Sequence, residues 1–218
     1  MLWVFDVNET MLDLSPLDEV FAKHTGTPGL RTAWFDLLIR AALTTTAAGA
    51  YRDFAQLGAA CARAVAQAHG TPLDDAAVAD LGAAMRALPP HPDTHPALAT
   101  LRERGQRLVA LANSPQAVVD AQLQHAQLAP FFHAIYSVER AGMLKPASAA
   151  YEMVLHAEGV TADQAVMVAA HDWDIAGAQA VGMRTVFVAR GGRTPLPGWP
   201  APDVTGPDLL QVAATDPF

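Results

Sequence analysis

Cysteine and long apolar runs are scarce in this sequence. The 218 residues include one cysteine, Cys61, so the chain cannot build an internal disulfide, and a reducing, cytoplasmic setting is expected. No apolar run reaches the ~18 residues that a membrane-spanning helix needs, and the segment after Met1 lacks the layout of a signal peptide. We therefore expect no membrane partner.

Positive charge is also in short supply. Lysine and arginine total 14 against 22 acidic residues, a net charge of −8, which argues against a nucleic-acid partner because such a surface needs a basic stripe. Only two of these 14 residues are lysine, Lys23 and Lys145. A guanidinium does not easily replace a compact ammonium beside a carboxylate, so the place of each lysine in the fold is informative.

The chain is rich enough in apolar residues for one large domain, or for one domain with an insertion. Hydrophobic residues make up 51% of it and charged residues 17%. After a short buried strand over residues 2–5, the pattern is helical from about residue 15 to residue 88, and Pro89 and Pro90 end it. One apolar stripe there follows the helical period: Phe54, Leu57, Gly58, Cys61 and Val65.

Strands and helices then alternate, which predicts an α/β protein with a parallel sheet covered on both faces. We expect the region 191–218, rich in proline and glycine, to be a surface tail. The expected strands cover 108–112, 134–138, 165–170 and 185–188, and the expected helices cover 95–104, 116–127, 147–158 and 174–181.

Polar side chains follow consecutive strands of this predicted sheet. Asp6 follows the first strand, Asn113 the second, Lys145 comes shortly after the third, and His171 and Asp174 follow the fourth. Functional sites of parallel sheets lie beyond the carboxyl ends of the strands. An ammonium group near carboxylates keeps a nucleophilic aspartate ionised. The set predicts a catalytic site at this edge.

Four segments of the chain form an ordered set of motifs. They are Phe5-Asp6-Val7-Asn8-Glu9-Thr10, Leu108 to Asn113, Lys145-Pro146 and Asp174-Ile175-Ala176-Gly177-Ala178. In this order they resemble the haloacid dehalogenase superfamily over essentially the whole chain. The resemblance implies a Rossmann-like core formed by residues 1–13 and 91–218, a helical cap domain over 14–90, and Asp6 as covalent nucleophile.

Most members of that superfamily are magnesium-dependent phosphatases, and two of their residues are missing here. Their general-acid aspartate corresponds to Asn8, whose amide cannot give a proton to a leaving alcohol. Their metal-binding aspartate corresponds to Ala170, which has no ligand atom. The sequence thus favours the branch that needs no metal, the L-2-haloacid dehalogenases, and we expect no cofactor.

Several residues are similar to that branch. Thr10 lies four residues after Asp6, Tyr151 lies six residues after Lys145, Trp34 matches a cap tryptophan, and Trp173 precedes Asp174. The resemblance implies a hydrolase of the (S)-2-haloacid or haloacetate type. Its carboxylate nucleophile displaces halide from a short 2-haloalkanoic acid, and water then hydrolyses the aspartyl ester to a 2-hydroxy acid.

The resemblance also assigns roles within this reaction. Lys145 and Asp174 organise Asp6 and the water, supported by Tyr151 and Thr10, and Asn113 donates to the leaving halide. The expected catalytic residues are Asp6, Thr10, Lys145, Tyr151, His171 and Asp174, and the expected substrate-binding residues are Asn8, Trp34, Phe35, Arg40, Asn113 and Trp173.

Some positions depart from the dehalogenase pattern. Phe35 replaces an arginine that receives halide or carboxylate, and Arg40 is a candidate substitute. His171 is either the base that activates water or an ordinary loop residue. Two other functions stay open: a magnesium-dependent phosphatase, and a catalytically silent binding protein, the latter because of Ala112, Ala169 and Phe35. The expected partner is a small halogenated carboxylate, and a homodimer is compatible with the resemblance.

Overall fold

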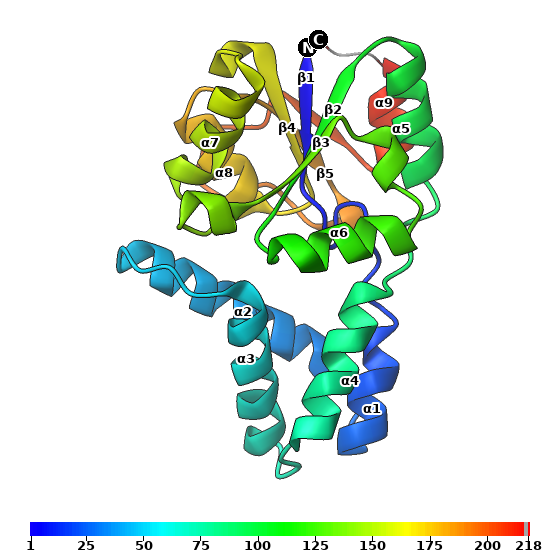
Figure 1. The fold of residues 1–218 in the computed structure, drawn as a ribbon, viewed down its shortest axis with the longest axis vertical. Helices are drawn as coiled ribbons and strands as arrows, with labels where there is room; N and C mark the ends of the chain where they lie inside the picture. The colour runs from blue at the N-terminus through cyan, green and yellow to red at the C-terminus, as the bar shows by residue number, and fades with distance from the viewer. Residues whose placement is uncertain (216–217) are drawn as a thin grey trace.

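The computed structural model describes residues 1–215 and 218, and it contains a parallel sheet flanked by helices (Figure 1). Within this part of the chain the sheet has six strands in the order β3-β2-β1-β4-β5-β6. All five strand pairings are parallel. The strands are β1 (Leu2–Phe5), β2 (Arg107–Ala112), β3 (Ala134–Ser137), β4 (Ala165–Ala169), β5 (Arg184–Val188) and β6 (Val204–Gly206).

The helices divide into two groups by position along the chain. Four lie between β1 and the rest of the sheet: α1 (Leu17–Thr25), α2 (Leu30–Ala47), α3 (Phe54–Ala68) and α4 (Asp75–Arg86). The others connect or follow the strands: α5 (Thr94–Glu103), α6 (Gln116–His125), α7 (Ser148–Glu158), α8 (Asp172–Ala180) and α9 (Leu209–Thr215), with short 3-10 turns η1 (Ala129–Phe131), η2 (Val138–Ala141), η3 (Ala162–Gln164) and η4 (Arg190–Gly192).

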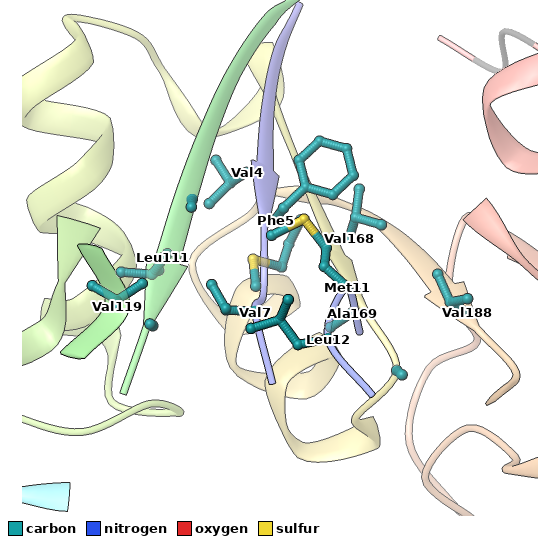
Figure 2. Packing of buried hydrophobic residues seen from close by; sticks show 14 of the residues in the cluster. Val4, Phe5, Val7, Met11, Leu12, Leu111, Val119, Val168, Ala169 and Val188 are labelled. Atoms are coloured by element: carbon teal, nitrogen blue, oxygen red, sulfur yellow. The ribbon is translucent and has the colours of Figure 1, made fainter. Parts of the chain in front are cut away.

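The central strands are apolar throughout, because helices cover both faces of the sheet. Every residue of β1 and of β4 is buried. Figure 2 shows Phe5, Val7 and Met11 packed together at the carboxyl end of β1, near Val168 of β4. This packing fixes the position of the chain immediately after β1, where Asp6 lies. The predicted α/β class, with a parallel Rossmann-like core and inserted helices, is confirmed.

Helices α1 to α4 lie beyond the carboxyl ends of the strands (Figure 1). Asp53 and Asp74 begin two of them by accepting backbone N–H bonds of 2.9 and 2.8 Å. The indole of Trp34 on α2 donates to the carbonyl of Gly58 on α3, at 2.8 Å, which joins the two helices. The four helices span residues 17–86, and the boundaries of a separate cap domain at 14–90 stay a prediction.

The expectation of a surface tail over residues 191–218 was wrong for residues 204–215, and residues 216 and 217 lie outside the described part of the chain. Residues 204–206 form β6 at the edge of the sheet, and residues 209–215 form α9, which packs on α5. The strand is only three residues long and too short for a visible alternation, which is why proline and glycine dominated the pattern. Within residues 1–215 and 218, no helix is long and apolar enough to cross a lipid bilayer.

Candidate active site

The polar residues predicted at the strand ends meet around Asp6. Asp6 directly follows β1, Asn113 follows β2, and His171 lies between β4 and α8. Lys145 arrives on the segment between η2 and α7. All four side chains are buried, with exposed fractions of 1–7%. The sheet topology therefore brings side chains from four segments that are distant in the sequence into one cluster.

One side of this cluster consists of Lys145, Asp174 and Tyr151, and we call it the Lys145 side. The ammonium of Lys145 donates to Asp6 Oδ1 at 2.8 Å, to Asp174 Oδ2 at 2.7 Å and to the carbonyl of Leu111 at 3.0 Å. The hydroxyl of Tyr151 donates to Asp174 Oδ1 at 2.7 Å. All three protons of the ammonium and both oxygens of Asp174 are thus engaged.

The other side consists of His171, Glu9 and Arg193, and we call it the His171 side. Nδ1 of His171 lies 3.0 Å from Asp6 Oδ2, and Nε2 lies 3.0 Å from Glu9 Oε2. Arg193 donates to the same oxygen of Glu9 at 2.6 Å. Thr10 completes the surroundings of Asp6, because its hydroxyl donates to Asp6 Oδ2 at 2.6 Å. Asp6 is therefore held from both sides.

These contacts set the protonation state of Asp6 and His171. Burial would raise the pKa of Asp6, but the charge of Lys145 and the hydrogen bond from His171 outweigh burial and hold that pKa well below its usual range. Burial would lower the pKa of His171, but hydrogen bonds to Asp6 and Glu9 outweigh it and raise the pKa to about 9. At neutral pH a charged imidazole thus faces an ionised carboxylate.

The remaining shifts agree with this picture. Burial and the nearby charge of Asp6 raise the pKa of Asp174, against the opposing effect of Lys145. The charges of Asp174 and Asp6 overcome burial and raise the pKa of Lys145, which stays an ammonium. Burial and the charge of Asp174 raise the pKa of Tyr151, which stays a hydrogen-bond donor.

A small cavity opens on Asp6. It offers about 10 Å³ to the centre of a water molecule, roughly the space that one water needs. Asn113 lies on its wall: Oδ1 accepts from the backbone N–H of Lys145 at 2.8 Å, while the buried Nδ2 has no partner within the described residues. The lining residues are Asp6, Asn8, Phe35, Ile39, Phe54, Ala112, Asn113, His171 and Trp173.

Aromatic rings shape this cavity around His171. The rings of Phe35 and Trp173 stack on the imidazole, with centroids 5.8 and 5.0 Å away. A larger hollow of about 400 Å³ shares Phe35, Ile39, His171 and Trp173 with the small cavity and also touches Arg40 and Arg193. Arg40 is exposed there and has no ion-pair partner among residues 1–215 and 218.

Two predicted substrate-binding residues are placed differently from the others. Trp34 is 2% exposed and lies outside the lining of the small cavity. It borders instead an apolar cavity of about 160 Å³ that α2, α3 and α4 form together with Ser114, Pro115 and Val118. Asn8 reaches the small cavity, but its amide is engaged on both ends, with Ser114 at 3.3 Å and Gln122 at 3.0 Å. Trp34 therefore positions helices rather than touching the cavity.

The sequence reading missed Glu9 and Arg193. Glu9 adopts a left-handed backbone conformation, φ 60°, which is uncommon for a residue other than glycine. Its carboxylate is thereby turned to His171, with Arg193 on the same oxygen. Glu9 lies within the first motif, Phe5 to Thr10, but its spacing from the other motif residues gave no reason to assign it a role. Arg193 lay in the region expected to be a tail.

The magnesium ion used by phosphatases of the resembled superfamily does not fit these residues. Lys145, Thr10 and His171 already occupy the oxygens of Asp6, and two of them are cationic. Asn8 has its amide bonded, and Ala170 offers no side-chain ligand. Within residues 1–215 and 218 no group of three acidic, histidine or cysteine side chains is arranged to hold a metal.

Comparison with known proteins agrees with the fold and the motifs. Residues 2–182 match the family model described as haloacid dehalogenase-like hydrolase. An (S)-2-haloacid dehalogenase of Pseudomonas putida is 26% identical over 193 residues, 87% of this chain and 85% of that protein. A phosphoserine phosphatase of Thermus thermophilus is 34% identical over 128 residues, 58% of this chain and 51% of that protein.

The fold is also similar to a solved structure. The L-2-haloacid dehalogenase of Xanthobacter autotrophicus, with chloropropionic acid covalently bound, superposes with a TM-score of 0.91 over 99% of this chain and 97% of that chain, at 21% identity. With a family model matched over residues 2–182, this chain belongs to the haloacid dehalogenase-like hydrolases.

Proposed function

We propose that this protein is a hydrolytic dehalogenase of short 2-haloalkanoic acids that works through an ester on Asp6 and needs no metal. The observation that carries the proposal is the ionised Asp6 carboxylate, held by Lys145 and His171 and open to a small cavity. The relatedness to an (S)-2-haloacid dehalogenase supports the same chemistry.

The first half-reaction is an in-line displacement at carbon. A carboxylate oxygen of Asp6 forms a bond to the carbon that carries the halogen, the carbon–halogen bond breaks, and the halogen leaves as halide with the electron pair of that bond. Lys145 and Thr10 hold the carboxylate in one orientation. The unpartnered Nδ2 of Asn113 is a donor in the cavity wall and is suited to the departing halide.

The second half-reaction hydrolyses the ester. Water attacks the carbonyl carbon of Asp6, and the oxygen–carbon bond to the substrate breaks to release a 2-hydroxy acid. The cavity beside Asp6 and His171 holds about one water, and Phe35 and Trp173 keep bulk solvent from it. Both oxygens of Asp174 are engaged away from the cavity, which assigns Asp174 to positioning Lys145.

The substrate carboxylate needs a positive partner in place of the arginine that Phe35 replaces. Arg40 lines the 400 Å³ hollow that leads to His171 and Trp173 and has a free guanidinium within the described residues. We assign it to substrate capture. Because the cavity at Asp6 is small, haloacetates and 2-halopropionates are the expected substrates.

The test is halide release from chloro-, bromo- and fluoroacetate and from both enantiomers of 2-chloropropionate, in the presence of EDTA. The wild type should release halide from at least one acid, and Asp6→Asn should release none. A single turnover in H₂¹⁸O with excess enzyme should place the heavy oxygen in Asp6, because water attacks the ester carbonyl.

Phosphate-ester hydrolysis is the competing outcome of the same experiment. A panel of phosphate monoesters with magnesium serves as the comparison. Halide release without metal, together with no phosphate release, is the expected pattern. Phosphate release combined with no halide release would replace the proposal by a phosphatase, and inertness in both panels would indicate a silent member of the family.

A further inference from the structure

Gln122 lies where the wall of the small cavity meets the inserted helices. It is on α6 and is 0% exposed. Its Nε2 donates to the backbone carbonyl of Met85 on α4 at 2.8 Å and to Oδ1 of Asn8 at 3.0 Å. Asn8 in turn lines the small cavity beside Asp6. One side-chain amide therefore connects α4 to the wall of the proposed site.

The orientation of both amides follows from the contact with Met85. A backbone carbonyl can only accept, so Gln122 must turn its NH₂ group, and not Oε1, toward it. The same NH₂ group then needs an acceptor from Asn8, which therefore turns Oδ1 toward Gln122. The NH₂ group of Asn8 faces away from Gln122, and one of its N–H bonds goes to Ser114 Oγ at 3.3 Å. The second N–H has no partner within residues 1–215 and 218.

An unsatisfied atom marks this choice of orientation. Oε1 of Gln122 is buried and has no hydrogen-bond partner among the residues that the structure describes. Few buried polar groups of native proteins are left unpaired, because an unpaired acceptor is destabilising. Rotating both amides by half a turn would let Oε1 accept from Asn8, but it would place Oε1 against the carbonyl oxygen of Met85 and would direct the oxygen of Asn8 away from Gln122. The contact with α4 therefore selects the orientation in which Asn8 offers N–H.

We propose that Gln122 is a positioning residue, which makes Asn8 a second N–H donor to the leaving halide beside Asn113. This inference rests on the proposed function. Nδ2 of Asn113, also without a partner in the described part of the chain, lies on the wall of the same cavity. As the carbon–halogen bond breaks, the halogen takes the electron pair and becomes an anion. No proton moves in this step, and the two amides stabilise the developing charge.

The lining of the cavity explains why a second donor is needed. Phe35 lines it at the position where the resembled family has an arginine that receives halide, and a phenyl ring donates no hydrogen bond. The ammonium of Lys145 has its three protons directed to Asp6, Asp174 and the carbonyl of Leu111. Neutral N–H groups on the cavity wall are therefore the donors that the structure offers to the halide.

The dependence on the halogen separates this role from a purely structural one. A smaller halide concentrates its charge and accepts a stronger hydrogen bond, so chloride gains more from an N–H donor than bromide does. A variant that merely loosens the contact between α4 and α6 should slow the reaction of every haloacetate by one common factor. A variant that misdirects Asn8 should slow chloroacetate more than bromoacetate.

The first experiment measures kcat/KM for chloroacetate and bromoacetate in Gln122→Met, which keeps the length of the side chain and removes its donors. We expect kcat/KM to fall about tenfold for chloroacetate and by a smaller factor for bromoacetate. The matched control is Gln124→Met, an exposed glutamine on the same helix, which should change neither value. Equal losses for the two acids, or no loss, would overturn the proposal.

A double-mutant cycle tests whether Gln122 acts through Asn8. Asn8→Ala removes the donor itself and should lower kcat/KM for chloroacetate about a hundredfold. Adding Gln122→Met to Asn8→Ala should then cause no further loss, because the amide that Gln122 orients is absent. Losses that multiply in the double variant would show that Gln122 acts independently of Asn8 and would overturn the proposal.

Halide binding without turnover gives a third measurement. Asp6→Asn imitates the uncharged ester, and its side-chain amides are followed by ¹⁵N NMR during titration with sodium bromide, with signals assigned from Asn8→Ala and Asn113→Ala. The Nδ2 signals of both Asn8 and Asn113 should shift, and adding Gln122→Met should abolish the response of Asn8 alone. Sodium sulfate at equal ionic strength is the control, because sulfate exceeds a cavity of about 10 Å³.

The outcomes keep the two proposals apart. A bromide response of Asn113 without one of Asn8 would overturn the role of Asn8 and Gln122 while leaving dehalogenation in place, and this test does not need Gln122→Met to fold. Absence of halide release from the wild type with every acid would overturn the proposed function. The bromide titration would then still decide whether Asn8 and Asn113 bind an anion together.

Discussion

The two sides of Asp6 differ in how far their polar groups are closed off from solvent. On the Lys145 side, Lys145, Asp174 and Tyr151 are 0–1% exposed, and every polar atom of their charged groups has a partner. On the His171 side, the imidazole lines the small cavity, and Glu9 and Arg193 line a neighbouring hollow of about 280 Å³. The Lys145 side is therefore closed to solvent, and we call it the sealed side; the His171 side faces these cavities, and we call it the open side.

This difference indicates separate roles for the two sides: one orients Asp6, and the other contains a group that can change its protonation state. The sealed side fixes the direction of the Asp6 carboxylate, and the pKa of its ammonium is raised from 10.5, so it keeps one state across neutral pH. The open side contains the group whose pKa, about 9, lies close enough to neutrality to change when a neighbouring charge disappears. Variants on the sealed side should therefore lower stability and halide release, whereas variants on the open side should change the pH dependence.

The largest effect is expected for Lys145→Met, which removes the ammonium group of the sealed side. The substitution leaves Asp174 buried without a cation and leaves Asp6 with His171 as its one remaining cationic partner among the described residues, and removing one partner of a buried ion pair costs about 3–5 kcal/mol. The free energy of unfolding measured with urea should fall by this amount, and halide release from the substrate should disappear. Lys23→Met is the matched control, because Lys23 is exposed on α1, and it should unfold like the wild type.

The second prediction concerns the pH dependence of stability on the open side. The pKa of His171 is raised from 6.5 to about 9 in the folded protein, so folding favours the protonated ring. Its contribution, roughly 3 kcal/mol at most, is fully present below about pH 6.5 and is lost as pH rises through about 9. The depressed pKa of Asp6 acts in the opposite direction, at acid pH.

The measurement is urea unfolding of wild type and His171→Gln between about pH 6 and pH 10. The difference in unfolding free energy between the two proteins should be largest at the acid end of this range and shrink toward the alkaline end. A difference that does not change with pH would mean that folding leaves the pKa of His171 unshifted, so that its contacts to Asp6 and Glu9 do not favour the protonated ring.

The fold and the sealed side could be read from the sequence for the same reason. Parallel strands buried on both faces are continuous apolar runs, and the residues that end them are brought together by topology alone. Asp6, Asn113 and Lys145 stood at such positions. A short edge strand such as β6, Val204–Gly206, carries no comparable pattern, so the final region was misread.

On the open side, the sequence predicted His171 from its place after the fourth strand but did not predict its partners Glu9 and Arg193, because their contacts depend on backbone geometry and on pairing between distant segments. Glu9, which contacts His171, has a left-handed backbone, and a glutamate at that position gives no sequence signal for this conformation. Arg193 reaches Glu9 from a segment 184 residues away in the chain. The place of Trp34 between α2 and α3 likewise follows from helix packing and not from its match to a motif.

The smallest effect is expected for Gly177→Ala, which disturbs the sealed side without touching a charge. A Cβ on Gly177 would stand 2.5 Å from the Tyr151 hydroxyl and 2.6 Å from Pro146 Cβ, closer than real atoms allow. Overpacking of this kind costs about 1–3 kcal/mol, and moving the hydroxyl from Asp174 should slow halide release. Gly82→Ala on α4 is the control: its nearest neighbour is the flexible end of Arg86 at 3.6 Å, so helix propensity should make it slightly more stable. If Gly177→Ala also lowers the pKa of His171, the two sides are coupled rather than independent.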